Sequence, residues 1–194
     1  MQIVLASQSP YRRLLLENLG LDFLAEKPAV DEEELKSLGP EDIRELSRYL
    51  AFHKAESLRA RFPGSILIGS DQIAEFDKKK LDKPGTRERA IEQLMSLQGG
   101  THSLITSMAL IGPSSTVTYT DITRLTMRPL SREEVELYID LDQPLDCAGS
   151  YKFEKAGIAL IEKVETQDPS AIQGLPLISL VDGLNKLGFN FKQM

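Results

Sequence analysis

Residues 2–20 read QIVLASQSPYRRLLLENLG, a stretch that predicts a strand, a loop and a helix in that order. The apolar residues 2–6 are suited to the strand. Ser9 is placed to cap the helix, with Pro10 at its first position, where a missing N–H costs nothing. Gly20 suits the left-handed residue that closes such a helix. We therefore expect a helix over residues 11–19 that begins shortly after a strand.

The rest of the chain alternates between apolar runs and helical patterns. Residues 65–74 predict a buried strand, and residues from 40 to about 61 predict a helix because their apolar positions recur every three or four residues. The acidic residues 31–34 indicate a loop or a helix start. Further expected elements are strands over 21–26, 102–112, 116–128 and 157–162, a hairpin turn at 77–80, and helices over 86–98, 131–141 and 176–187. The pattern predicts one α/β domain over residues 1–194, with a mixed sheet, flanking helices and a cleft.

Composition excludes several classes of protein. The chain has 194 residues, of which 41% are hydrophobic and 27% charged, which is typical of a globular domain and excludes disorder. The single cysteine excludes a disulfide scaffold, and the apolar start of the chain is too short for a signal peptide, so we expect a cytoplasmic location. The mean hydropathy of −0.20 and the lack of a long apolar run argue against a membrane protein. A net charge of −6 argues against binding to a nucleic acid polymer.

A small anion is still a suitable ligand, because the loop at residues 7–9 and the following helix combine several groups that bind phosphate. A helix N-terminus offers free N–H groups, Ser7 and Ser9 add hydroxyls, and Arg12 and Arg13 add guanidinium groups. These features predict an anion site. The alternative is an ordinary helix start with two solvated arginines.

Asp71 is the main candidate for chemistry, because it follows an apolar run at the point where a strand presents polar residues. A carboxylate in this position can bind Mg²⁺ or take a proton from water, although a turn or a cap is the alternative. Asp31 and Glu32 are a second source of carboxylates for a metal, unless they form a solvated face. Further candidates are Lys54, Lys83 and Lys152, each of which is also compatible with an ordinary surface lysine.

Other chemistries lack their motifs. The chain contains no Gly-x-x-x-x-Gly-Lys-Ser/Thr loop, no Gly-x-Gly-x-x-Gly and no Gly-x-Ser-x-Gly. Two histidines and one cysteine are too few for a structural zinc site. We expect His102 to be a residue at a strand start with a satisfied hydrogen bond, and Cys147 to be a small buried filler.

These motifs, taken together and in order, resemble those of the Maf family of nucleoside triphosphate pyrophosphatases. The resemblance extends over nearly the whole chain and rests on residues 6–15 (ASQSPYRRLL), 69–72 (GSDQ), 83–84 (KP), 148–151 (AGSY) and 174–177 (GLPL). It implies a mixed sheet in two lobes around a nucleotide cleft, as in inosine triphosphate pyrophosphatases. It also implies hydrolysis of the α–β phosphate bond with Mg²⁺ or Mn²⁺.

The resemblance also implies roles for individual residues. Asp71 is expected to accept the proton of the attacking water or to bind the metal, with Glu32 as a further metal ligand. The residues expected to hold the triphosphate are Ser7, Ser9, Arg12, Arg13, Lys54 and Lys83.

Three positions are implied to select the base. The branch of the family that acts on dTTP and UTP typically has Arg, Thr and Gln where this chain has Tyr11, Gln72 and Glu154, so the chain resembles the 7-methyl-GTP branch. Methylation at N7 makes guanine cationic, so Tyr11 is suited to stack on it and Glu154 to neutralise it. The 7-methyl-GTP branch often has Trp in place of Tyr11.

Alternative functions are left open by the sequence. These are a pyrophosphatase of dTTP and UTP, a broader enzyme for modified nucleotides, and a nucleotide-binding regulator of cell division without turnover. The family resemblance also suggests a homodimer.

Overall fold

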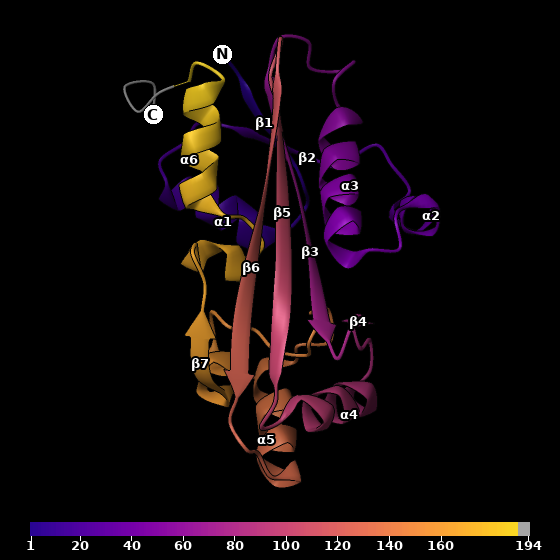
Figure 1. Ribbon diagram of the computed structural model, residues 1–194. Helices are drawn as coiled ribbons and strands as arrows, with labels where there is room; N and C mark the ends of the chain where they lie inside the picture. Colours follow the sequence, from indigo (N-terminus) through magenta and orange to yellow (C-terminus); the bar gives the residue numbers. More distant parts are fainter. Residues whose placement is uncertain (190–194) are drawn as a thin grey trace. The chain divides into compact units, whose positions relative to one another are not determined.

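The computed structural model, shown in Figure 1, describes residues 1–189. Within this range the strands form a seven-stranded sheet in the order β2-β1-β3-β5-β6-β7, with β4 paired to β3. The β1–β2 and β1–β3 pairs are parallel, whereas β3–β4 and β6–β7 are antiparallel, so the sheet is mixed. The predicted α/β class with a mixed sheet and helices is confirmed.

The bounds of the elements agree with most of the expected ranges. The strands are β1 (Ile3–Ala6), β2 (Leu24–Glu26), β3 (Ile66–Phe76), β4 (Lys79–Leu81), β5 (Thr101–Ile111), β6 (Thr116–Met127) and β7 (Ile161–Glu165). The α-helices are α1 (Pro10–Asn18), α2 (Glu32–Leu38), α3 (Ile43–Glu56), α4 (Arg87–Leu97), α5 (Arg132–Asp142) and α6 (Leu177–Lys186). Two short 3-10 helices are η1 (Ala156–Leu160) and η2 (Pro169–Gln173).

The chain divides into two compact units, here called unit 1 and unit 2. Unit 1 comprises residues 1–72, 106–121 and the chain from residue 168 onward, and unit 2 comprises residues 73–105 and 122–167. The expectation of one domain with a nucleotide cleft stays a prediction.

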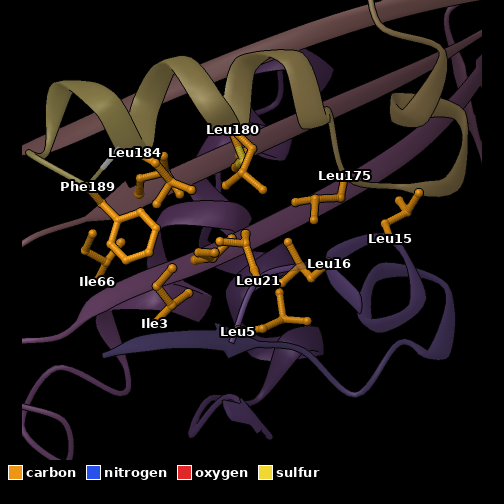
Figure 2. Close-up of a cluster of buried hydrophobic side chains, with 13 residues drawn as sticks. Ile3, Leu5, Leu15, Leu16, Leu21, Ile66, Leu175, Leu180, Leu184 and Phe189 are labelled. Atoms are coloured by element: carbon orange, nitrogen blue, oxygen red, sulfur yellow. The ribbon is translucent and has the colours of Figure 1, made fainter. Parts of the chain in front are cut away.

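The core of unit 1 lies on both faces of β1, because successive side chains of a strand point to opposite faces. Ile3 and Leu5 belong to a cluster that includes residues of α1 and α6, and Figure 2 shows this cluster. Val4 and Ala6 belong to a second cluster with Ala55 of α3. In Figure 1, α6 and α3 accordingly lie on opposite sides of the strands of this unit. The four residues of β1 are therefore all buried, which explains why the strand is continuously apolar.

The expected cap of α1 is confirmed, because Ser9 caps this helix with Pro10 at its first turn. Thr86 caps α4, and Ser131 forms a capping box with Glu134 at the start of α5. The acidic stretch proves to be a helix start, because the Asp31 side chain accepts N–H bonds at the beginning of α2.

The expected helix over residues 40–61 is too long at both ends. The side chain of Asp42 accepts the N–H groups of Arg44 and Glu45, so α3 begins at Ile43. After Ser57 the regular helix ends, because the N–H groups of Leu58, Arg59 and Arg61 each bond to the carbonyl three residues back. Hydrophobic periodicity continues through such turns and does not reveal this end.

The strand expected over residues 157–162 is largely wrong. Residues 156–160 form η1, and β7 begins only at Ile161. Gly157 lies so close to the backbone of Lys152 that a Cβ atom there would meet its carbonyl oxygen, and the Gly157 N–H donates to the same oxygen at 3.2 Å. This tight turn prevents an extended backbone. The 3-10 helix η2 was not predicted.

The core of unit 2 contains a histidine. His102, near the start of β5, is 1% exposed, and its Nε2 lies 2.7 Å from the hydroxyl of Tyr151. Among the described residues its Nδ1 has no partner, so the expected hydrogen bond satisfies only one ring nitrogen. Cys147 is half-buried rather than buried, and burial raises the pKa of its thiol to about 12. Burial lowers the pKa of His102 to about 4.

We expect His102 to make the protein less stable in mild acid. Because the pKa of His102 is about 4 in the folded chain and near 6.5 in an unfolded one, the unfolded state binds more protons between these values. The free energy of unfolding should therefore be highest above pH 6.5 and fall by up to roughly 3 kcal/mol as the pH drops towards 4. Urea unfolding at pH 7.5 and pH 5 measures this change. His102→Gln should reduce the change in the free energy of unfolding between the two pH values. An equal reduction with His53→Gln would contradict the assignment to His102.

Candidate active site

The polar residues after the apolar part of β3 form the centre of the candidate site. The first six residues of this strand are buried, and they end with Gly69, Ser70 and Asp71. Asp71 is 6% exposed, although it is a carboxylate. A carboxylate is almost never buried to this degree without a partner, so its surroundings decide what it can do.

Gly69 allows α3 to lie against β3 at this point. A Cβ atom on Gly69 would overlap the backbone oxygen of Ala51 and would come within 2.8 Å of the backbone nitrogen of Ala55. Helix and strand backbones are therefore in direct contact here. Lys54, which lies between these two helix residues, can consequently reach Asp71, two residues further along the strand than Gly69.

Lys54 binds two carboxylates with its ammonium group. Its Nζ lies 2.7 Å from Oδ1 of Asp71 and 2.8 Å from Oε2 of Glu32, at the start of α2. The side chains of Lys54 and Asp71 are both 8% exposed, whereas that of Glu32 is 46% exposed. Burial alone would raise the pKa of Glu32, but the ammonium groups of Lys54 and Lys36 outweigh this effect and lower it. The arrangement is one buried cation between two anions.

The loop at residues 7–9 and the start of α1 form the second part of the site. The N–H of Ser9 donates to the hydroxyl of Ser7 at 3.1 Å, and Arg12 donates to the same hydroxyl from Nη1 at 3.4 Å. The Nε of Arg12 donates to the carbonyl of Gly174 at 2.8 Å. Burial lowers the pKa of this guanidinium, and the opposite effect of the Asp71 and Glu32 carboxylates is smaller. The carboxylates of the first part therefore act electrostatically on Arg12.

Residues 171–174, at the end of η2, accept hydrogen bonds from several side chains of the site. Gln72 donates from Nε2 to the carbonyl of Ala171 at 2.8 Å, and Thr106 donates to the same carbonyl at 3.0 Å. Ser70 donates to the carbonyl of Gly174 at 2.8 Å. Sequence analysis did not identify Thr106, and it indicated Gly174 only as part of a motif without a role.

Gly174 has to be glycine for two reasons. Its φ of +92° lies in the left-handed region, and a Cβ atom there would come within 3.1 Å of Nε of Arg12. The loop that follows is held by Asp168, which is 3% exposed and accepts the N–H groups of Ser170 and Ile178 at 3.1 and 2.7 Å. The α6 helix thus receives a cap from outside its own first turn.

The expected site residues are therefore brought together only in part. The expected residues that make the contacts described above all lie in unit 1: Ser7, Ser9, Arg12, Glu32, Lys54, Asp71 and Gln72. Arg13 points elsewhere, because its Nε binds Glu17 at 2.8 Å on an exposed face. Tyr11 is half-buried on α1, and Lys83 and Glu154 are exposed residues of unit 2. Lys152 donates to the carbonyls of Asp142 and Gln143, at the end of α5.

The carboxylates fit a magnesium-type ion that is shared with a substrate. Such an ion is commonly held by one or two carboxylates, several waters and phosphate oxygens. Asp71 and Glu32 both contact the same ammonium group, so their oxygens converge on one point. Within residues 1–189 no group of three or more His, Cys, Asp or Glu side chains is arranged to hold a metal by itself. The donor set therefore fits a metal that takes its other ligands from water and from a bound molecule.

Comparison with known proteins gives the family. The family model described as "Maf-like protein" matches residues 2–187. The chain belongs to the Maf family. It is 49% identical to the 7-methyl-GTP pyrophosphatase of Bdellovibrio bacteriovorus over 92% of this chain and 93% of that protein. It is 44% identical to the proteins of the same name from Hahella chejuensis, over 96% and 94%, and from Pseudomonas putida, over 96% of each.

One further comparison adds little about this Maf protein. A HAM1 protein from Coxiella burnetii has 16% identity and a TM-score of 0.33 over 66% of this chain and 73% of that chain, a likeness too slight to bear on the fold. As for membranes, none of the helices within residues 1–189 combines the length and apolar character needed to cross a bilayer.

Proposed function

We propose that this chain hydrolyses 7-methyl-GTP to 7-methyl-GMP and diphosphate. The observation that carries the proposal is the buried Lys54–Asp71 pair, which places a carboxylate in the same unit as the anion-binding groups of Arg12 and the loop at residues 7–9. The names of the similar proteins support the choice of substrate.

The triphosphate is proposed to bind at the loop and at the start of α1. Arg12 already uses Nε to bind Gly174, so its terminal N–H groups are oriented by the protein before a ligand binds. Ser7 and Ser9 add hydroxyl groups, and the positive end of the α1 helix dipole favours negative charge. Lys54, a buried cation of the same unit, is proposed as a further phosphate contact, together with Arg13 and Lys83.

Asp71 is proposed to accept a proton from the attacking water. The water oxygen forms a bond to the α-phosphorus, the bond from that phosphorus to the bridging oxygen breaks, and diphosphate leaves with the electron pair. Lys54 binds Oδ1 of Asp71, so Oδ2 is the oxygen placed to take the proton. The ammonium group also offsets negative charge that builds up near the carboxylates.

Asp71 and Glu32 are the residues that would hold a divalent cation, Mg²⁺ or Mn²⁺. When bound, such a cation neutralises charge on the leaving diphosphate. Since Lys54 now contacts both carboxylates, a cation and the ammonium group would share the same oxygens.

Selection of the base is proposed to rest on Tyr11 and Glu154, and the family resemblance implies the same role for Gln72. An aromatic face attracts a cationic ring, and a carboxylate pairs with it, which suits a guanine that carries a methyl group on N7. A cytoplasmic location and a homodimer stay predictions.

Product analysis tests this function. The purified protein is incubated with Mg²⁺ or Mn²⁺ and 7-methyl-GTP, GTP, dTTP or UTP, and diphosphate is separated from orthophosphate. We expect diphosphate chiefly from 7-methyl-GTP, with Asp71→Asn prepared in parallel to reveal contaminating phosphatases. Preference for dTTP or UTP would overturn the assignment of the base. Nucleotide binding without diphosphate release would instead indicate a regulatory protein.

A further inference from the structure

Gln72 follows Asp71 directly, and its side-chain amide is bound inside unit 1. Its Nε2 lies 2.8 Å from the carbonyl oxygen of Ala171, 3.2 Å from that of Ile172 and 2.9 Å from the hydroxyl of Thr106. Carbonyl oxygens only accept hydrogen bonds, so the atom facing them must be the nitrogen and not the amide oxygen. Both hydrogens of Nε2 are therefore used within the protein.

The hydroxyl of Thr106 can take only one role in its hydrogen bond with Gln72. Its hydroxyl donates its single hydrogen to the carbonyl of Ala171 at 3.0 Å, and so it has to accept the bond from Gln72. Thr106 is 0% exposed, which means that no water replaces either bond. The two side chains together fix the position of the Ala171 carbonyl.

The same short segment reaches Arg12. The N–H of Gly174 donates to the carbonyl of Ala171 at 2.9 Å, and the carbonyl of Gly174 accepts Nε of Arg12 at 2.8 Å. A continuous series of hydrogen bonds therefore runs from Gln72 and Thr106 through residues 171–174 to the guanidinium group. The hydroxyl of Ser70 lies 2.8 Å from the carbonyl oxygens of both Gly174 and Ser107, which share its single hydrogen.

We infer that Gln72 and Thr106 are positioning residues that orient Arg12 towards the phosphates, through the backbone of residues 171–174. The inference rests on the proposed function for the identity of the substrate, but it concerns the phosphates rather than the base. It differs from the role of Gln72 implied by the family resemblance, which is selection of the base. A contact with the base is left only to Oε1 of Gln72, because its N–H groups are occupied.

Inorganic tripolyphosphate separates the two roles, because it has phosphates and no base. Its affinity is measured by titration calorimetry for the wild type, Gln72→Met and Thr106→Val. Each variant keeps a similar side-chain size, and each loses the hydrogen bond that its own side chain donates to the carbonyl of Ala171. We expect both to bind tripolyphosphate about tenfold more weakly, since a lost buried hydrogen bond is worth roughly that factor. The ratio of kcat/KM for 7-methyl-GTP to that for GTP should stay as in the wild type.

Two further variants serve as controls. Thr106→Ser keeps the hydroxyl and should bind within about twofold of the wild type. Thr123→Val removes another threonine hydroxyl that is 0% exposed, but one that donates to Thr166 in unit 2, and it should also leave the affinity unchanged. Thermal melting checks that every variant is folded, and if Thr106→Val is not, Gln72→Met and Thr106→Ser carry the comparison.

The outcomes are distinct. Unchanged tripolyphosphate affinity in Gln72→Met, together with a lower ratio of 7-methyl-GTP to GTP, would overturn the inference and favour a base contact through Oε1. A wild type that does not bind tripolyphosphate would also overturn it. A third outcome is a wild type that binds tripolyphosphate and hydrolyses no nucleotide, while both variants bind tripolyphosphate more weakly. In that case the proposed function fails and the positioning role stands.

Discussion

Asp71→Asn is expected to lower kcat for nucleotide hydrolysis by about a thousandfold, because an amide cannot accept the proton of the attacking water. Asn has nearly the same shape as Asp, and its oxygen can still accept a hydrogen bond from Lys54. The ammonium group also keeps its contact with Glu32. The variant should therefore fold, which circular dichroism and a thermal melt would check, and diphosphate release would give kcat.

Glu75→Gln is the matched control for this substitution. Glu75 lies on the same strand, four residues further along, and is half-buried without a place in the proposed chemistry. Its neutralisation should leave kcat within about twofold of the wild type. Near-normal turnover of Asp71→Asn would remove Asp71 from the mechanism, even if the control behaves as expected.

Lys54→Met is expected to cause the largest loss of stability. The substitution keeps the length of the side chain but leaves Asp71, whose side chain is 8% exposed, without the cation at 2.7 Å. Removing one partner of a buried pair typically costs about 3–5 kcal/mol, because the remaining charge is left uncompensated. Urea unfolding at neutral pH measures this loss in the free energy of unfolding.

A double variant and a surface control sharpen this result. Lys54→Met combined with Asp71→Asn should be more stable than Lys54→Met alone, since the stranded charge is gone. Lys163→Met removes a cation from the exposed pair with Glu165, whose two side chains are 62% and 52% exposed, and should cost no more than about 1 kcal/mol. If Lys54→Met and Lys163→Met lowered the free energy of unfolding equally, the buried pair would stabilise the fold no more than the exposed pair does.

The sequence predicted the fold well where local signals and burial agree. Ser9, Pro10 and Gly20 set the limits of α1, and the alternation of Ile3, Val4, Leu5 and Ala6 between two clusters follows from the geometry of a strand. The errors occur where a tertiary contact decides the backbone. Gly157 is turned towards Lys152, and no periodicity in the sequence shows that contact.

The site was predicted as a set of residues rather than as a geometry. Asp71 and Lys54 were found as single candidates, but their pairing depends on Gly69, whose lack of a side chain lets a helix approach a strand. Thr106 was missed because an isolated threonine in an apolar strand resembles an ordinary strand residue. Its role comes from the carbonyl of Ala171, 65 residues away in the chain.

Unit 1 is assembled from three separated stretches of chain, and this has a consequence for how the protein is made. During synthesis the loop at residues 7–9 and Arg12 leave the ribosome long before Gly174, which holds the guanidinium and lies 162 residues further along the chain than Arg12. Leu180 and Leu184, which complete the cluster around Ile3 and Leu5, emerge later still. The nascent chain therefore carries an unfinished hydrophobic face and an unoriented arginine until residues 174–184 have emerged, and the proposed phosphate site cannot form before then.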